Sequence, residues 1–375
     1  YVGRNEGYPP VDIDLYLSKM VPQEHPGLFY ISHSGAEGVS GGGPYRTSLV
    51  SRYFDNLFGA DKLHSERGAP TIMNYENLVR SLGEENVNPV NTIEHPNDMY
   101  GAHDFNLGTT KFSAQRGYLF NEFYAKAFGS QPHDAKEFTM LSQWICYDTY
   151  RAIFESRAEH RQGVLLWMSH PSWPSLVWQT YDYFFEPTAA YFGCKKGSEP
   201  IHIFLNPVKR DIEVVNYCAG NLSALKATAY IYDISGKEVW SKTVALDIKE
   251  DATKQCFPLD VPATTSDTYF VRLYLHSADG KQLSENFYWQ GKEEGNFQGI
   301  RKLPQTKVDM KVSGKNGHYT AVITNNSETP ALMLRVKAVD SKTDDLILPV
   351  WYSDNYISLM AGESRSITIR LRSED

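Results

Sequence analysis

Residues 163–193 read GVLLWMSHPSWPSLVWQTYDYFFEPTAAYFG, and this stretch decides how the first half of the chain is interpreted. The apolar run from Gly163 to Trp167 has the length and composition of a buried strand. Two long helical patterns precede it, at about residues 111–128 and 134–160. A strand that follows helices in this way indicates a parallel α/β arrangement.

The same alternation of strand and helix patterns runs upstream of that stretch. Strands are predicted near residues 1–3, 28–32 and 62–66, and helices at residues 11–17 and 73–82. Pro9-Pro10 begins the first helix, and Gly83 stops the second. Residues 1–197 are therefore predicted to form a single α/β domain.

After about residue 197, the sequence changes to patterns typical of short alternating strands. The turn pairs Ser235-Gly236 and Asp279-Gly280 separate strand patterns at the regular spacing of an antiparallel sandwich. A polar linker follows at residues 291–304, and a second strand-rich block ends the chain. We expect two immunoglobulin-like β-sandwich domains, at residues 198–291 and 300–375.

The charge balance and the cysteines exclude several classes of protein. The 375 residues carry 37 basic and 45 acidic side chains, a net charge of −8 with no basic stretch, which argues against a nucleic-acid partner. No apolar run approaches the roughly 20 residues of a membrane span. The four cysteines form no CxxC pair, so we expect no zinc and no other cofactor, and a disulfide between domains is left open.

Aromatic residues are abundant, with 24 Tyr, 18 Phe and 7 Trp. Such rings pack cores, and they also form platforms for the apolar faces of sugars. Trp167 and Trp173 come just after a predicted strand, so either could stack against a sugar ring or belong to the core. Tyr30 lies near the end of another predicted strand and is a candidate for contact with the same ligand.

Two glutamates also lie where strands are predicted to end. Glu6 follows Gly3-Arg4-Asn5, and Glu66 follows Ser65 and precedes Arg67-Gly68. Side chains at the carboxyl ends of parallel barrel strands line one site. Two carboxylates about 5–5.5 Å apart can cleave a glycosidic bond with retention of configuration. Alternatively, each glutamate is a solvent-exposed loop carboxylate with no catalytic role. Arg67 could lower the pKa of Glu66 or form a surface salt bridge.

Seven segments resemble those of a known family. Five lie in or near the aromatic stretch, and two lie closer to the C-terminus. The first five are Trp167-Met168, residues 173–178, Tyr181-Asp182-Tyr183, residues 190–196 and residues 199–202. The other two are residues 284–289 (SENFYW) and 352–356 (YSDNY). Together they resemble glycoside hydrolase family 2, in particular its branch of exo-β-glucosaminidases, endo-β-mannosidases and β-mannosidases. The resemblance spans nearly the whole chain.

The family resemblance implies roles for particular residues. An Asn-Glu acid/base ends barrel strand 4 in that family, and a Glu nucleophile ends strand 7. Asn5-Glu6 matches the first pattern and Ser65-Glu66 matches the second. Asn5 would then bind the substituent at C2 of the sugar, and Ser65 would lie beside the substrate. No metal is needed for this chemistry.

The resemblance also implies a fold and a setting. The chain would hold the C-terminal half of a (β/α)8 TIM barrel followed by the two sandwiches, with further N-terminal domains in the intact protein. We expect such a half barrel alone to be poorly stable and nearly inactive. Export to the periplasm or the extracellular space is typical of such enzymes.

The reaction implied by the resemblance is hydrolysis of β-linked glycans with retention, as in a β-mannosidase. Glucosaminidases of the branch tend to carry Ser-Asp where this chain has Asn5-Glu6, which weakens that alternative. An exo-β-glucosaminidase, an endo-β-mannosidase and a non-catalytic carbohydrate-binding protein remain the other hypotheses.

Overall fold

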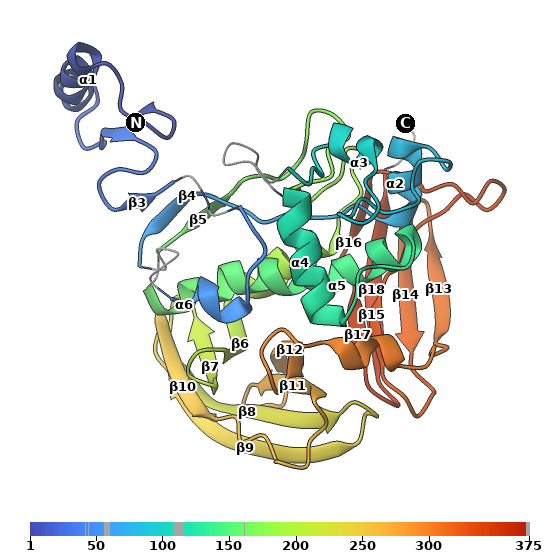
Figure 1. The fold of residues 1–375 in the computed structure, drawn as a ribbon. Coiled ribbons are helices and arrows are strands. Elements are labelled where there is room, and N and C mark those ends of the chain that lie inside the picture. The colour runs from blue at the N-terminus through green and yellow to red at the C-terminus, as the bar shows by residue number, and fades with distance from the viewer. Residues whose placement is uncertain (42, 44, 56–60, 109–115, 161, 373–375) are drawn as a thin grey trace.

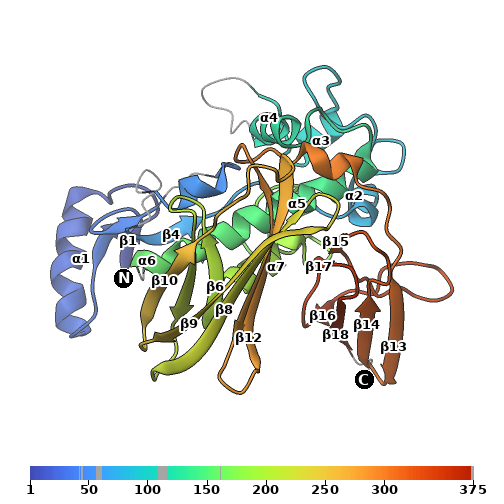
Figure 2. The same ribbon diagram turned by 90° about the horizontal axis from the view of Figure 1, so that it is seen from below.

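The computed structural model describes residues 1–41, 43, 45–55, 61–108, 116–160 and 162–372. Short parallel strands and small helices come first, a long central helix follows, and antiparallel sheets make up the remainder (Figures 1 and 2). The α-helices are α1 (Val11–Glu24), α2 (Tyr75–Leu82), α3 (Asp98–Ala102), α4 (Arg116–Phe128), α5 (Ala135–Glu155), α6 (Arg157–His160) and α7 (Ala189–Gly197). Two 3₁₀ helices are η1 (Val50–Tyr53) and η3 (Gln298–Lys302).

Five short strands in the N-terminal part pair in parallel. They are β1 (Val2–Arg4), β2 (Ile31–His33), β3 (Val39–Ser40), β4 (Leu63–Arg67) and β5 (Val164–Leu166). Strand β1 pairs with β2, and β4 lies between β3 and β5. Because all these pairings are parallel, the carboxyl ends of neighbouring strands meet at one edge. The α/β arrangement predicted from the alternation is present here.

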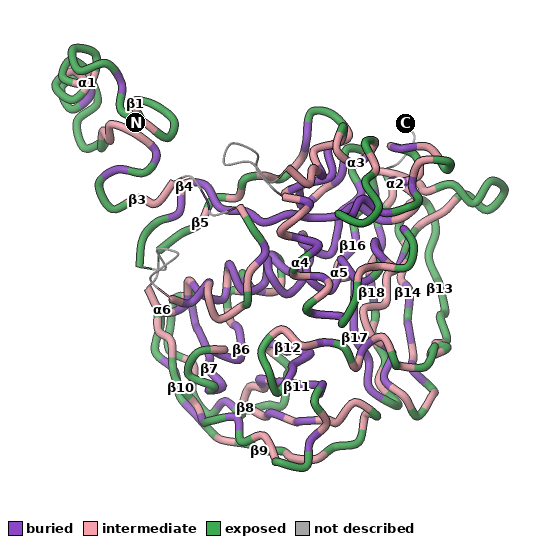
Figure 3. Tube along the Cα trace, in the orientation of Figure 1, coloured by how far each residue is buried: buried purple, intermediate pink, exposed green. Residues whose placement is uncertain are grey.

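Helix α5 forms the centre of the molecule. Asp134 caps its N-terminus by accepting a hydrogen bond from the Glu137 N–H at 2.8 Å, and Glu137 accepts one from the His133 N–H at 2.7 Å. Helix α7 packs closely against it, because a Cβ at Gly193 would lie 2.3 Å from the Tyr147 carbonyl oxygen. Figure 3 shows buried residues concentrated along α5 and the inner strands, whereas α1 is largely exposed.

Two antiparallel sheets follow α7. Their strands are β6 (Ile201–Asn206), β7 (Asp211–Asn216), β8 (Leu222–Asp233), β9 (Glu238–Ile248), β10 (Ala252–Pro258), β11 (Thr268–His276) and β12 (Gln282–Gly291). One sheet has the order β10-β7-β6 and the other β12-β11-β8-β9. The predicted turns at Ser235-Gly236 and Asp279-Gly280 join β8 to β9 and β11 to β12, with φ near 90° and 84° at the two glycines.

The C-terminal part forms a second pair of antiparallel sheets. Its strands are β13 (Asp309–Lys315), β14 (His318–Thr324), β15 (Ala331–Leu334), β16 (Val350–Tyr352), β17 (Ile357–Leu359) and β18 (Ser364–Leu371). The sheet orders are β13-β14-β18-β16 and β15-β17. Apolar side chains of these strands join one core with α4, α5 and Trp289 of β12, so the C-terminal sheets are packed against the body of the molecule (Figure 2).

Four details differ from the sequence-based expectations. The strand expected at residues 28–32 is β2, shifted to Ile31–His33, and Phe29 is 87% exposed. The run expected to be a buried strand is β5, an edge strand whose Leu165 is 61% exposed. The helix expected at 134–160 ends at Glu155, where the Ser156 hydroxyl donates to the Ile153 carbonyl. Strand β3 (Val39–Ser40) is not among the predicted strands. Residues 111–115 of the helix predicted at 111–128 lie outside the described residues.

Candidate active site

The Glu6 loop is attached to the neighbouring strand through Ser34. Glu6 lies two residues beyond β1 with φ of 51°, a left-handed conformation that is uncommon for a residue with a side chain. Its N–H donates to the Ser34 Oγ at 2.9 Å, and that hydroxyl lies 3.3 Å from the Asn5 Oδ1. Ser34 directly follows β2, so the carboxyl ends of β1 and β2 hold Asn5 and Glu6 together.

Ser34 also connects this loop to the strand that carries Glu66. The Ser65 hydroxyl donates to the Ser34 carbonyl oxygen at 2.5 Å. Glu66 is the next residue along β4 and is 9% exposed, whereas Glu6 is exposed. One serine therefore contacts both predicted catalytic segments, and Asn5, Glu6 and Ser65 lie close together around it.

Trp167 directly follows β5, the strand that pairs with β4. Its N–H donates to the Arg67 carbonyl at 2.9 Å, and its own carbonyl would be 2.0 Å from a Cβ at Gly68. Glycine at 68 therefore permits the close approach of the two strand ends. The indole is 43% exposed beside the Glu66 segment, and the Trp167–Met168 peptide bond is cis.

Arg67 is a buried residue, with 3% exposure. The expectation of a surface salt bridge is therefore wrong. Its guanidinium contacts the Gly43 carbonyl at 3.3 Å and lies over the Tyr53 ring at 5.1 Å. Burial lowers the pKa of this guanidinium. Arg67 anchors the end of β4 to the segment that precedes it.

Three further residues lie near Glu66, and none of them was assigned to this site from the sequence. Burial raises the pKa of Tyr45, and the carboxylates of Glu66 and Glu6 raise it further, which places this hydroxyl near both glutamates. The hydroxyl is buried and has no partner of standard hydrogen-bond geometry in the described part of the chain. The Tyr45 ring lies 5.5 Å from that of Trp178, and the Arg116 guanidinium lies 3.3 Å from the centroid of Trp178.

The positive charge of Arg116 acts on the Tyr45 hydroxyl. It lowers the pKa of Tyr45 and so opposes the effect of the two carboxylates. Burial lowers the pKa of Arg116, while the nearby Asp104 raises it. Tyr45, Trp178 and Arg116 come from three distant parts of the chain, so the sequence patterns could not group them.

Trp173 lies in the loop after β5 and is 43% exposed. Its ring stacks on His103 with centroids 5.7 Å apart, and the His103 Nδ1 contacts the Pro174 carbonyl at 2.5 Å. These contacts fix the loop and leave half of the indole accessible. Direct contact between Trp173 and a sugar stays a prediction.

Tyr30 lies at the opposite end of its strand from the two glutamates. It precedes β2, and its hydroxyl donates to the Asp14 Oδ1 of α1 at 2.6 Å. That hydrogen bond is the main cause that raises the Tyr30 pKa to about 12. The structure does not bring Tyr30 to the predicted site, because the strand begins later than the apolar run suggested.

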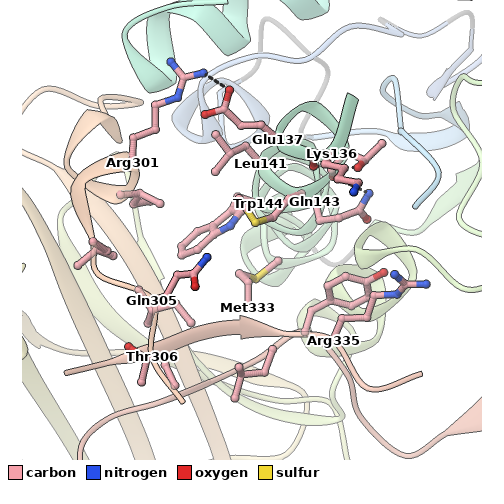
Figure 4. Close-up of a pocket in the computed structure, with 18 of the residues that line it drawn as sticks. Lys136, Glu137, Leu141, Gln143, Trp144, Arg301, Gln305, Thr306, Met333 and Arg335 are labelled. Carbon is pink, nitrogen blue, oxygen red and sulfur yellow. Dashed lines mark hydrogen bonds and ion pairs between the residues drawn. The ribbon is translucent and has the colours of Figure 1, made fainter. Parts of the chain in front are cut away.

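A cavity away from the two glutamates lies between α5 and the C-terminal sheets. Its volume is about 510 Å³, and Figure 4 shows Trp144, Gln305 and Met333 around it, with Arg301 paired to Glu137. Within the residues described, no group of three metal-binding side chains occurs, and no helix is long and apolar enough to cross a membrane. The four cysteines are free thiols.

Two family models match the antiparallel part of the chain. Residues 210–292 match the mannosidase Ig/CBM-like domain, and residues 286–375 match the exo-β-D-glucosaminidase Ig-fold domain. These matches agree with immunoglobulin-like folds for the two pairs of sheets.

Relatives match nearly the whole chain. An exo-β-D-glucosaminidase of Amycolatopsis orientalis is 27% identical over 388 residues, covering 91% of this chain and 36% of that enzyme. A mannosylglycoprotein endo-β-mannosidase of Lilium longiflorum is 26% identical and covers 64% of this chain and 32% of that enzyme. The crystal structure of the Amycolatopsis orientalis exo-chitosanase CsxA aligns with a TM-score of 0.83 and 25% identity, over 99% of this chain and 48% of that one.

These relatives are glycoside hydrolases. The chain is related to the exo-β-glucosaminidases and β-mannosidases of glycoside hydrolase family 2, which confirms the resemblance drawn from its motifs. It spans well under half the length of the curated relatives, 36% of the Amycolatopsis orientalis enzyme and 40% of one from Arthroderma benhamiae.

Proposed function

We propose that this chain carries the two catalytic carboxylates of a retaining β-glycosidase, with Glu66 as the nucleophile and Glu6 as the acid/base. The observation that carries the proposal is the contact of Ser34 with both the Glu6 N–H and the Ser65 hydroxyl. The five parallel strands would form the C-terminal half of a (β/α)8 barrel, in which strand ends line the active site. The named activities of the relatives support this reading.

The two glutamates have different surroundings, which supports giving them different roles. Glu66 would attack the anomeric carbon while Glu6 protonates the leaving oxygen, and Glu6 would then accept a proton from the incoming water. Glu66 is buried beside the Tyr45 hydroxyl, whereas Glu6 is exposed where a leaving group and water can approach. The Asn5 Oδ1 faces the Ser34 hydroxyl, so its amide nitrogen can donate to the C2 substituent.

The charge of the site favours a β-mannoside over a β-glucosaminide. Arg116 places a guanidinium near Tyr45 and Trp178, and a positive charge there repels the ammonium group of glucosamine. Asp104 offsets part of this charge. We expect Arg116→Gln to raise the ratio of glucosaminidase to mannosidase activity roughly threefold to tenfold. A matched Arg52→Gln variant should leave the ratio unchanged.

The direct test is hydrolysis of chromogenic β-mannoside, β-glucosaminide, β-galactoside and β-glucuronide by the protein as it is naturally expressed. Release from one substrate should fall by roughly 10³- to 10⁵-fold in Glu66→Gln. Glu6→Gln should lose most activity toward poor leaving groups and retain more toward activated ones. Unchanged turnover in Glu66→Gln would overturn the nucleophile assignment. An endo-β-mannosidase would require a larger glycan, and a non-catalytic binding protein would bind one without cleaving it.

A further inference from the structure

A second cavity is lined in part by residues of the aromatic stretch 163–193 that take no part in the glutamate site. It has a volume of about 380 Å³ and lies between residues 181–192 and the β16–β18 pair of the C-terminal sheet. Tyr181, Phe185 and Tyr191 contribute from the first side, and Trp351 and Arg370 from the second. This volume falls in the range typical of small-molecule sites.

The turn that carries Phe185 has a conformation that bulky residues rarely adopt. Phe185 has φ of 64°, and its ring is nevertheless 54% exposed. The buried Asp182 fixes the turn, because its Oδ1 accepts hydrogen bonds from the N–H groups of Phe184 at 2.9 Å and Glu186 at 3.0 Å. A strained residue held by its surroundings marks a candidate functional position. Here the strain presents an apolar ring to the solvent.

The aromatic rings around the cavity are held in fixed positions. The ring of Phe185 stacks on His170 with centroids 4.2 Å apart and an angle of 13° between the planes. Tyr181 and Tyr191 lie 4.9 Å apart on the same wall. Trp351 on the other wall is 41% exposed. Fixed, partly exposed rings of this kind are suited to the flat apolar faces of sugars, because little side-chain freedom is lost on binding.

The charged residues that line the cavity itself, Arg370 and Arg372, are positive. Arg370 pairs with Trp351 in the β16–β18 register, and its guanidinium lies 4.7 Å from the Trp351 ring centroid. The Lys195 Nζ lies 5.5 Å from the same ring. Among the described residues that line the cavity there is no aspartate or glutamate, and Arg370 has no ion pair there. A guanidinium without a carboxylate partner is suited to an acidic ligand.

We propose that this cavity is a non-catalytic binding site for an oligosaccharide that carries acidic groups, such as uronates. Phe185, Tyr181 and Trp351 contact the sugar rings, and Arg370 pairs with a carboxylate of the ligand. The proposal goes beyond the hydrolysis proposed above and does not depend on it, because binding here requires neither Glu6 nor Glu66.

The test is binding of three trisaccharides to the Glu66→Gln protein, measured by calorimetry. They are a β-1,4-linked mannuronate, the uncharged β-1,4-mannotriose and the cationic glucosamine trimer. We expect the mannuronate to bind at least tenfold more tightly than the glucosamine trimer, with an affinity that falls as salt is added. Phe185→Ala and Trp351→Ala should each weaken its binding roughly fivefold to tenfold. Arg370→Gln should remove the preference for the acidic over the neutral sugar.

A matched control is Tyr183→Ala, which removes a 39% exposed ring from the same turn outside the cavity. It should bind as the parent does. Circular dichroism melting of each variant establishes that it is folded before binding is compared. Equal affinity of parent, Phe185→Ala and Trp351→Ala for the mannuronate would overturn the proposal. So would a preference for the glucosamine trimer.

Discussion

Two of the buried carboxylates, Glu155 and Glu66, have contrasting surroundings. Where α5 meets β6 and β12, the Glu155 Oε1 accepts hydrogen bonds from His202 at 3.0 Å, Asn286 at 2.9 Å and Tyr288 at 2.7 Å. At the parallel strand ends, Glu66 is similarly enclosed, with 9% exposure against 3% for Glu155. Glu66 lies near the Tyr45 hydroxyl, and no comparable network around it is seen among the residues that the structure describes.

The different surroundings of Glu155 and Glu66 suit a structural role for Glu155 and, under the proposed function, a catalytic role for Glu66. A buried charge is tolerated when hydrogen bonds and opposite charges replace the water that it loses. Glu155 obtains those partners from its own chain and therefore holds α5 to the sandwich. No such set of partners surrounds Glu66 in the described part of the chain, and under the proposed function its carboxylate is therefore available to the sugar. The same difference separates a stabilising acid from a reactive one.

The largest effects are expected when the charge of each carboxylate is removed in turn, which tests directly whether Glu155 and Glu66 differ in role. Glu155→Gln should lower the free energy of unfolding by about 3 kcal/mol, because His202 and the buried Arg151 lose their charged partner. Glu66→Gln should change that free energy by less than about 1 kcal/mol while abolishing turnover. Urea unfolding of the two variants beside the parent measures both. The reverse pattern, a large loss of stability in Glu66→Gln and none in Glu155→Gln, would contradict the comparison.

A smaller effect is expected from Ser34, which connects the two predicted catalytic segments. Ser34→Ala removes the acceptor of the Glu6 N–H and the partner of Asn5, but leaves the carbonyl that accepts from Ser65. We expect roughly a tenfold loss of kcat from misplaced Glu6 and a stability loss of about 1 kcal/mol. Ser18→Ala, on an exposed face of α1, is the matched control. Unchanged kcat in Ser34→Ala would show that the contact does not position Glu6.

The smallest expected effect is a dependence of stability on pH at the Glu155 network. Burial opposes the charge of His202, but its hydrogen bonds to Glu155 and Glu199 outweigh burial and raise its pKa above 6.5. Its contribution to stability is therefore complete below about pH 6.5 and is lost as the pH rises through the folded pKa. Burial also raises the pKa of Glu199, but His202 and Lys196 outweigh it and lower that pKa to about 2.

The contribution of Glu199 has the opposite sign. It is complete above about pH 4.5 and is lost as the pH falls toward 2. The combined contribution of His202 and Glu199 to stability should thus be greatest between roughly pH 4.5 and 6.5 and fall on either side. Melting temperatures from pH 2 to 9, compared between the parent and His202→Gln, measure this contribution, and His202→Gln should flatten the alkaline side. A profile that is identical in His202→Gln and the parent would contradict the assignment.

Local patterns predicted much of this arrangement. The parallel strands, the turns at Gly236 and Gly280, and the placing of Glu6 and Glu66 at strand ends follow from periodicity and from neighbouring residues. The family motifs identified the relatives. Each of these features depends on residues that are close together in the sequence.

Features set by tertiary contacts could not be read in the same way. Tyr30 was misplaced because β2 begins three residues later than its apolar run, and its hydroxyl is bound by Asp14 of α1. Tyr45 and Arg116 come together at the site from segments about 70 residues apart, and neither segment contains a pattern that predicts their proximity. The buried position of Arg67 depends on Gly43 and Tyr53, which lie in other elements.

The central claim is that Glu66 forms the covalent bond to the sugar. The most direct measurement is to incubate the naturally expressed protein with an activated 2-deoxy-2-fluoro-β-mannoside and to locate the label by peptide mass spectrometry. The account predicts one fluorosugar on the peptide that contains Glu66 and none on that peptide in Glu66→Gln. A label on Glu6 or on another carboxylate, with Glu66 unmodified, would contradict it.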